Sequence, residues 1–236
     1  MSGFADYHAH FVYGVDDGAQ TCQEMYVMLD AAAADGVTRL YATSHCMPGL
    51  EPFPQAVYER HLRDAQDYCA QKGYPMTLYA GGEILYTPAV AYAAAAHALP
   101  VLGTSRWILL EFVPDITAGE LETALEQLSG RGYRMMLAHV ERYACLAKGG
   151  LLRQLREQYP IRCQVNCSTV LQKDFWVRRR LNRWLREGVV DAVSSDAHNC
   201  GTRPTRMREA YRELCARVGQ SEADRLTGND GADLLR

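Results

Sequence analysis

Short apolar runs alternate along this chain with longer segments that carry helix-start and helix-stop residues. Seven runs are predicted strands: FADYHAH, LYATSH, LYAGGE, WILLEF, MMLAHVER, CQVN and AVSSDAH. Capping-box patterns open two of the intervening segments, at residues 21–24 and 117–120. Because strands that alternate with helices form parallel sheets, this order predicts an α/β fold. The strands are nearly continuous apolar runs, as expected when both faces of a sheet are covered.

The predicted helices between these strands end at glycines or other stop signals. They cover about 21–36, 58–72, 89–98, 117–130 and 151–158, then an arginine-rich segment that ends at Gly188, and finally 204–218 before a small polar tail.

Each predicted strand brings a polar side chain of metal-ligand or anion-binding type to its carboxyl end. These are His8 and His10, His45, Glu83, Glu111, His139 followed by Arg142, Asn166, and Asp196 with His198. If seven strands close into a (β/α)7 barrel, their carboxyl ends form one rim, where such barrels hold their reactive groups. The alternative, an open doubly wound sheet, gathers ligands at only one crevice. The pattern favours the barrel.

Composition and charge indicate the number of domains, the kinds of partner and the cellular location to expect. The 236 residues are 48% apolar without a break in composition, so we expect residues 1–236 to form a single domain. A net charge of −3 gives no electrostatic reason to expect nucleic acid as a partner. No stretch reaches the roughly 18 apolar residues of a membrane span, and no signal peptide is recognisable. With eight cysteines and no CxxC pair, we expect a cytoplasmic protein with reduced thiols.

One strongly basic stretch contains Arg178, Arg179, Arg180, Arg183 and Arg186. The simpler interpretation is a solvated helix face. The alternative is a docking surface for an acidic or phosphorylated partner.

The histidines and carboxylates at the predicted rim have the chemistry of metal ligands. His8 and His10 are two residues apart on a strand and therefore point to the same side. Asp17 lies in the loop behind them, which Asp16 is expected to cap. The full set of predicted ligands is His8, His10, Asp17, His45, Glu83, Glu111, His139, Asp196 and His198. Mixed imidazole and carboxylate ligands suit zinc, manganese or iron, and a set without cysteine favours a hydrolytic site over a structural zinc.

Nine ligands are too many for one ion, so the pattern predicts two or three divalent ions with a bridging carboxylate. Glu83 is the predicted bridge, because Gly81 and Gly82 before it let the backbone approach closely. Close-set ions lower the pKa of a bridging water, so that hydroxide is available at neutral pH, and they absorb charge on the oxygens of a phosphate.

Two arginines near the rim indicate a phosphate substrate. Arg142 and Arg203 follow two of the predicted ligand histidines by three and five residues. A planar guanidinium forks onto two phosphate oxygens, which a lysine cannot do. The alternative for each is a surface ion pair, for example with Glu141 or Asp115. We expect Arg142 and Arg203 to orient the phosphoryl group and to stabilise its transition-state charge.

These motifs resemble the polymerase and histidinol phosphatase (PHP) superfamily, and within it the bacterial metal-dependent tyrosine phosphatases of capsule and exopolysaccharide operons. The matching stretches are DYHAH with VDDGA, TSH, GGEI, LEF, LAHVERY, QVN and SSDAHN followed by Arg203. LAHxERY and SDAHN are specific to this branch, whereas HxH is not. The resemblance implies a distorted seven-stranded (β/α) barrel that holds three metal ions, often manganese, on the nine ligands above. It also implies phosphate binding by Arg142 and Arg203.

The substrate implied by the resemblance is phosphotyrosine on a cognate tyrosine kinase that controls polysaccharide export. Val140 stands where the branch usually has proline, and Cys167-Ser168 replaces a common Ala-Gly pair. Neither departure removes a ligand, but both are expected to reshape the pocket.

Three other interpretations remain open on the sequence. In the first, the same rim binds a small phosphate monoester such as histidinol phosphate. Phenolate, with a pKa of about 10, is a better leaving group than an alkoxide, which favours phosphotyrosine slightly. In the second interpretation, the protein is a non-catalytic metal-binding module. The third comes from Cys200 and Arg206, which fit the C-x5-R pattern of thiolate-dependent tyrosine phosphatases. Pro204 within that pattern removes an amide of the phosphate cradle, which favours the metal site.

Overall fold

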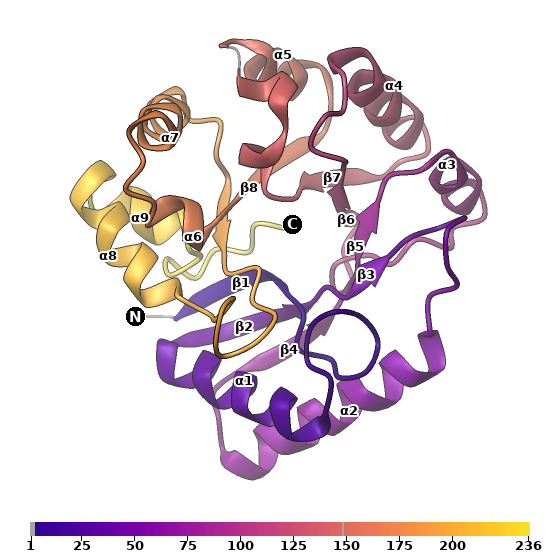
Figure 1. Ribbon diagram of the computed structural model, residues 1–236, viewed down its shortest axis with the longest axis vertical. Helices are drawn as coiled ribbons and strands as arrows, with labels where there is room; N and C mark the ends of the chain where they lie inside the picture. Colours follow the sequence, from indigo (N-terminus) through magenta and orange to yellow (C-terminus); the bar gives the residue numbers. More distant parts are fainter. Residues whose placement is uncertain (1–2, 148) are drawn as a thin grey trace.

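The computed structural model describes residues 3–147 and 149–236. Parallel strands lie around a central axis, and helices surround them on the outside (Figure 1). The strands are β1 (Phe4–Ala9), β2 (Val37–Ala42), β3 (His45–Cys46), β4 (Thr77–Ala80), β5 (Glu83–Leu85), β6 (Trp107–Glu111), β7 (Arg134–Leu137), β8 (Ile161–Asn166) and β9 (Ala192–Ser194). Among the described residues, no helix has both the length and the apolar character that a membrane span requires.

The α-helices in residues 3–147 and 149–236 are α1 (Cys22–Asp35), α2 (Gln55–Lys72), α3 (Pro88–Ala95), α4 (Ala118–Ser129), α5 (Leu151–Gln158), α6 (Cys167–Val170), α7 (Phe175–Glu187), α8 (Met207–Val218) and α9 (Gln220–Leu226). Seven of them begin close to predicted positions, whereas α6 and α9 were not predicted. Two short 3-10 helices, η1 (Val140–Arg142) and η2 (Ala144–Ala147), follow β7. The prediction of a polar tail after residue 218 is wrong, because α9 forms there and Leu235 is buried beyond it.

Two of the predicted strands are each broken in the middle. LYATSH divides into β2 and β3, and LYAGGE into β4 and β5, so the strands form two parallel sheets in the orders β1-β2-β4 and β3-β5-β6-β7-β8-β9. Gly81 and Gly82 occupy the second break. A Cβ on Gly82 would lie 2.6 Å from Cγ of Pro100, so a side chain there would clash. Glycine is therefore required at this position by close packing.

The first and last strands of the ring lie side by side. Ala9 and Ala197 form one parallel bridge, and the amide of Asp196 donates to the carbonyl of His8 at 2.8 Å. The ring thus closes through isolated contacts instead of a continuous ladder. The predicted α/β architecture, a distorted TIM-like barrel of parallel strands, is confirmed. Its distortion lies at the two strand breaks and at this closure.

The two predicted capping boxes differ in detail. At α4, Thr117 and Glu120 form both reciprocal hydrogen bonds. At α1, Thr21 accepts from the amide of Glu24, but the Glu24 carboxylate accepts from the amide of Gln20, so only half of the motif is present.

The end of the ring at the amino termini of the strands is packed with apolar and aromatic side chains. Tyr7, Trp107 and Leu235 belong to one buried cluster there, and the carboxy-terminal segment reaches the centre of the ring (Figure 1). The opposite end is left for the polar side chains that follow the strands.

Candidate metal centre

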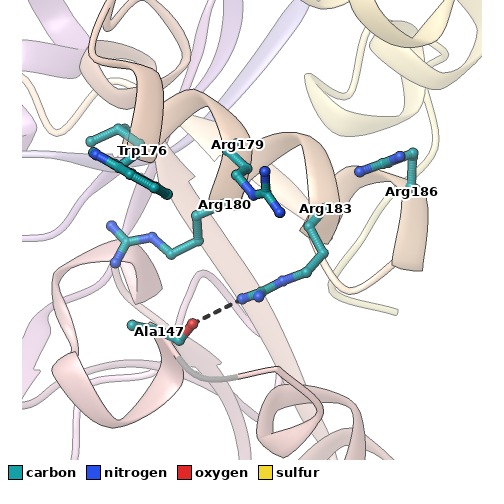
Figure 2. A pocket seen from close by; sticks show the side chains of 7 residues that line it. Ala147, Trp176, Arg179, Arg180, Arg183 and Arg186 are labelled. Atoms are coloured by element: carbon teal, nitrogen blue, oxygen red, sulfur yellow. Dashed lines mark hydrogen bonds between the residues drawn. The ribbon is translucent and has the colours of Figure 1, made fainter.

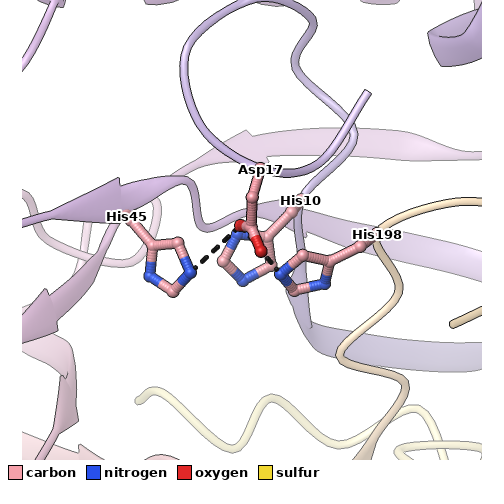
Figure 3. Close-up of side chains that lie close together, drawn as sticks. All are labelled: His10, Asp17, His45 and His198. Atoms are coloured by element: carbon pink, nitrogen blue, oxygen red, sulfur yellow. Dashed lines mark ion pairs between the residues drawn. The ribbon is translucent and has the colours of Figure 1, made fainter. Parts of the chain in front are cut away.

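All nine side chains predicted to be metal ligands meet at the carboxyl ends of the strands. Their nitrogen and oxygen atoms form four overlapping groups, and within each group the atoms lie within 4.8 Å of one another. The groups are His10, Asp17, His45 and His198 (Figure 3); His8, Glu83 and His139; His8, His10 and Asp196; and His45, Glu83 and Glu111. The overlap joins the nine side chains into one cluster with enough donor atoms for more than one ion.

Two of these side chains are held by strained backbone. His139 and Asp196 have positive φ angles of 31° and 54°. Residues other than glycine avoid this region, and such strain concentrates at functional sites. In both cases the unusual residue lies two positions after the end of a strand, β7 or β9, and its side chain belongs to the cluster.

Glu83 lies at the centre of the cluster and is 1% exposed. Its Oε2 lies 3.1 Å from Nε2 of His8, 3.2 Å from Nε2 of His10 and 3.2 Å from Nδ1 of His45. Its Oε1 lies 2.8 Å from Nε2 of His139. Burial would raise the pKa of Glu83, but the surrounding imidazoles hold it well below its usual range. A carboxylate with ring nitrogens on both oxygens has the geometry that a bridging ligand needs.

The spacing of the ring nitrogens tests whether these residues suit metal ions. Nε2 of His8 and Nε2 of His10 lie 3.1 Å apart, within a set of contacts that mostly measure 2.8–3.4 Å. Ligands at about 2.1 Å from an ion are about 3.0–3.4 Å from each other in octahedral or tetrahedral geometry. Within the part of the chain that is described, Nε2 of His198 has no hydrogen-bond partner but lies 3.2 Å from Oδ1 of Asp17. These spacings fit cation binding.

The electrostatics of the cluster also favour positive charge. Burial lowers the pKa of His10, but hydrogen bonds to Asp16 and Glu83 more than offset this and raise it to about 10. In the same way, contacts with Glu111 and Glu83 outweigh burial and raise the pKa of His139 to about 9. The carboxylates that stabilise protonated imidazoles would equally stabilise divalent cations in their place.

Two side chains orient the cluster in a way that the sequence did not predict. Asp16 caps its loop as predicted, accepting from the amide of Gly18, but its other oxygen also contacts Nδ1 of His10 at 2.8 Å and accepts from the amide of His45 at 3.0 Å. It therefore fixes the His10 ring with Nε2 toward the cluster. Burial would raise the pKa of Asp16, but these partners hold it at about 2.

Gln164 of β8 is the second residue that sequence reasoning missed. Its Oε1 accepts from the amide of His139 at 2.7 Å and lies 3.2 Å from Nδ1 of His8. Its Nε2 donates to Asn166, which in turn donates to Asp196 at 2.7 Å. The sequence carried a signal, because glutamine is unusual at a fully buried strand position and shares a strand face with Asn166.

Both predicted phosphate-binding arginines lie beside the cluster. Arg142 Nη2 is 2.7 Å from Asp196 Oδ2, and Arg203 Nη2 is 3.0 Å from Asp196 Oδ1. Their guanidinium groups are thus paired with Asp196 and not with Glu141 or Asp115. Together with Ser168 of α6 they line a pocket of about 360 Å³ that opens next to the metal-type ligands. This pocket has the charge that a phosphate group requires.

The alternative thiolate site lacks the features of a reactive cysteine. Cys200 is exposed, and partial burial of its sulfur raises the pKa of the thiol, whereas a nucleophilic cysteine needs a lowered pKa. Arg206, the other fixed position of the C-x5-R pattern, forms ion pairs with Glu209 at 2.6 Å.

Comparison with known proteins identifies the family. Residues 4–236 match the family model described as capsular polysaccharide synthesis, CpsB/CapC. The chain belongs to this family. The resemblance drawn from the sequence motifs is thereby confirmed.

Proteins named tyrosine-protein phosphatases align along almost the whole chain. Tyrosine-protein phosphatase CpsB of Streptococcus agalactiae serotype V is 26% identical over 239 residues, covering 98% of this chain and 98% of its own length. Tyrosine-protein phosphatase YwqE of Bacillus subtilis strain 168 is 26% identical over 231 residues, covering 98% and 90%.

Solved structures agree with this assignment. A structure described as YwqE from Bacillus subtilis and CpsB from Streptococcus pneumoniae, metal-dependent tyrosine phosphatases, superposes with a TM-score of 0.86 at 26% identity. It covers 98% of this chain and 93% of that one. Histidinol phosphate phosphatase of Lactococcus lactis, solved with zinc, L-histidinol and phosphate, superposes with a TM-score of 0.58 at 14% identity over 94% of each chain, which shows a shared fold.

Proposed function

We propose that this CpsB/CapC-family protein is a metal-dependent protein-tyrosine phosphatase that hydrolyses phosphotyrosine on a tyrosine kinase of polysaccharide export. The observation that carries the proposal is the meeting of nine imidazole and carboxylate side chains in one cluster, beside a pocket that Arg142, Arg203 and Asp196 line. Tyrosine phosphatase relatives that align over 98% of the chain support the substrate class. We also propose that this reaction takes place in the cytoplasm.

The nine ligands would hold two or three divalent ions, with manganese as the proposed metal and iron or zinc as alternatives. Ions bound there would supply water of lowered pKa and neutralise charge on the phosphoryl oxygens. Glu83 is the proposed bridging ligand, since both of its oxygens face imidazole nitrogens.

Arg142 and Arg203 are proposed to bind and orient the phosphoryl group. Each presents a guanidinium to the pocket from one side of Asp196. A phosphate dianion offers two such forks more acceptor oxygens than the single Asp196 carboxylate, so both arginines are expected to turn to the substrate. The two guanidinium groups then stabilise charge that develops as the bond to the phenolate oxygen breaks.

A direct test measures phosphate release with added manganese from three substrates: a phosphotyrosine peptide, a phosphoserine peptide and histidinol phosphate. The proposal expects the phosphotyrosine peptide to have the highest kcat/KM and a chelator to abolish turnover. A strong preference for histidinol phosphate would instead assign a small-molecule phosphatase. Bound metal without turnover of any phosphoester would indicate a metal-binding module.

A further inference from the structure

A basic groove runs along α7, apart from the metal centre. Trp176, Val177 and four arginines of this helix line it together with Ala147 of η2, and it encloses about 680 Å³ (Figure 2). The arginines are Arg179, Arg180, Arg183 and Arg186. We refer to this feature as the α7 groove.

The positive charge of the α7 groove is only partly neutralised. Within residues 3–147 and 149–236, no carboxylate lies within 4.0 Å of the guanidinium groups of Arg179 or Arg186, whereas Arg183 lies 4.0 Å from Glu187. Arg186 donates only to the carbonyl of Asn182 within its own helix. Unpaired guanidinium groups that share one hollow attract an anionic ligand.

Exposed aromatic rings accompany this charge. Trp176 is 71% exposed and Phe175 is 63% exposed. Their rings pack edge to face, with the ring centroids 5.2 Å apart. Large aromatic side chains are normally buried, and together with arginine they are enriched in protein-binding surfaces. The groove therefore combines the two residue types that dominate binding energy at such surfaces.

The α7 groove connects directly to the loop that carries Arg142. Arg180 donates to the carbonyl of Glu141 at 2.8 Å, and Arg183 donates to the carbonyl of Ala147 at 3.0 Å. Glu141 immediately precedes Arg142 in the chain. A polypeptide whose phosphotyrosine is bound at the metal centre would thus have neighbouring residues within reach of the groove.

We propose that the α7 groove binds an acidic segment of the phosphotyrosine-bearing polypeptide substrate, so that substrate choice depends on carboxylates or further phosphates near the reacting residue. This inference rests on the proposed phosphatase function. The concave shape favours a peptide over a flat lipid surface. Carboxylates of an extended peptide would pair with Arg179 and Arg186, and its apolar atoms would cover the Trp176 ring.

The kinetic test compares three probes: a phosphotyrosine peptide flanked by glutamates, the same peptide flanked by glutamines, and p-nitrophenyl phosphate. The variant carries Arg179→Glu with Arg186→Glu, which leaves the loop contacts of the two other arginines intact. The matched control carries Arg63→Glu with Arg131→Glu, two exposed positions on α2 and just after α4, away from α7 (Figure 1).

The expected result is a rise of about tenfold in KM for the glutamate peptide in the α7 variant, from two attractions turned into repulsions. Its kcat, and both constants for the other two probes, should match the control. An unchanged KM for the glutamate peptide would overturn the docking proposal. Absence of activity on p-nitrophenyl phosphate in the unmodified protein would instead remove the phosphatase assignment itself.

Intrinsic fluorescence supplies a second measurement that needs no turnover. Trp107 and Trp184 are 4% and 2% exposed, so Trp176 alone of the three tryptophans faces solvent. Adding the glutamate peptide with unphosphorylated tyrosine should shift Trp176 emission, and Trp176→Phe should remove the shift. Phosphatidylglycerol vesicles serve as the competing partner. Vesicle binding that the α7 variant loses while its peptide kinetics stay normal would replace the peptide with a membrane and overturn the proposal.

Discussion

Asp16→Asn tests whether metal binding depends on Asp16, which orients the proposed ligand His10 but is not itself a proposed ligand. Asp16 receives three hydrogen bonds, from the His10 ring and from the amides of His45 and Gly18. An ionised carboxylate has enough lone pairs for all three, whereas asparagine has one carbonyl oxygen and an NH₂ group that is itself a donor. The substitution therefore places the asparagine NH₂ group against at least one of these three N–H donors. The side chain of Asp16 is almost wholly buried, so water cannot easily take the place of the lost acceptor.

The expected size of the effect follows from these contacts. Losing a hydrogen bond to a charged group costs about 1.5–3 kcal/mol. If that loss falls on the orientation of His10, metal affinity should drop by about tenfold to a hundredfold, the range seen when an outer partner of a ligand is removed. The overall fold should survive, because Asp16 lies in a surface loop between β1 and α1.

The assay is bound metal by elemental analysis after dialysis at a series of free manganese concentrations, together with kcat/KM at saturating manganese. Asp17→Asn is the comparison at a proposed ligand, and Asp67→Asn is the control at an exposed position on α2. High manganese should restore most of the activity of Asp16→Asn. Metal affinity equal to that of the Asp67→Asn control would refute the role assigned to Asp16.

Three further predictions separate the remaining roles. Arg142→Lys and Arg203→Lys should each keep bound metal but lower kcat by roughly a hundredfold, because lysine cannot fork onto two oxygens; loss of metal by elemental analysis would contradict this. Cys200→Ser should retain full activity, and a large loss would revive the thiolate mechanism. Glu141→Ala should lower kcat about tenfold with metal retained, since Oε1 of Glu141 accepts from the amide of Asn166 and from a threonine hydroxyl and so fixes the loop that holds Arg142; wild-type rates would show that the loop keeps its position without these hydrogen bonds.

The alternation of apolar runs and helix signals was enough to predict the main strand–helix alternation and the edge of the sheet where the reactive groups meet. This works because parallel strands place their carboxyl ends together whatever the exact register. The breaks at Thr43-Ser44 and Gly81-Gly82 were not predictable, since they depend on packing between segments distant in sequence. The clash of a side chain at Gly82 with Pro100 is one example.

Strand irregularity limits what alternation can predict about the site. Tyr7 packs into the buried cluster at one end of the ring, and its neighbour His8 joins the metal-type cluster at the other. Strict alternation would send these two side chains to opposite faces of the sheet. The register of β1 against β2 shifts between Asp6 and Ala9. This irregularity allows the side chains of Tyr7 and His8 both to point into the interior of the ring. The contacts of Asp16 and Gln164 depend on such local geometry, so the sequence predicted which side chains gather in the cluster but not what orients them.

The two ends of the strand ring contribute differently to stability, because burying charged groups at one of them is unfavourable. Five imidazoles and four carboxylates gather at one rim, most of them buried, where unpaired charge is strongly unfavourable without a compensating ion. The other end of the ring is filled by Tyr7, Trp107 and Leu235, side chains that bury apolar area without needing a partner ion. Because only the first end gains from cations, divalent metal should stabilise the fold by an amount that rises with the logarithm of the free metal concentration once this exceeds the dissociation constant. Thermal stability measured against free manganese thus reports on the ligand cluster independently of any substrate, and a melting temperature indifferent to manganese would contradict cation binding there.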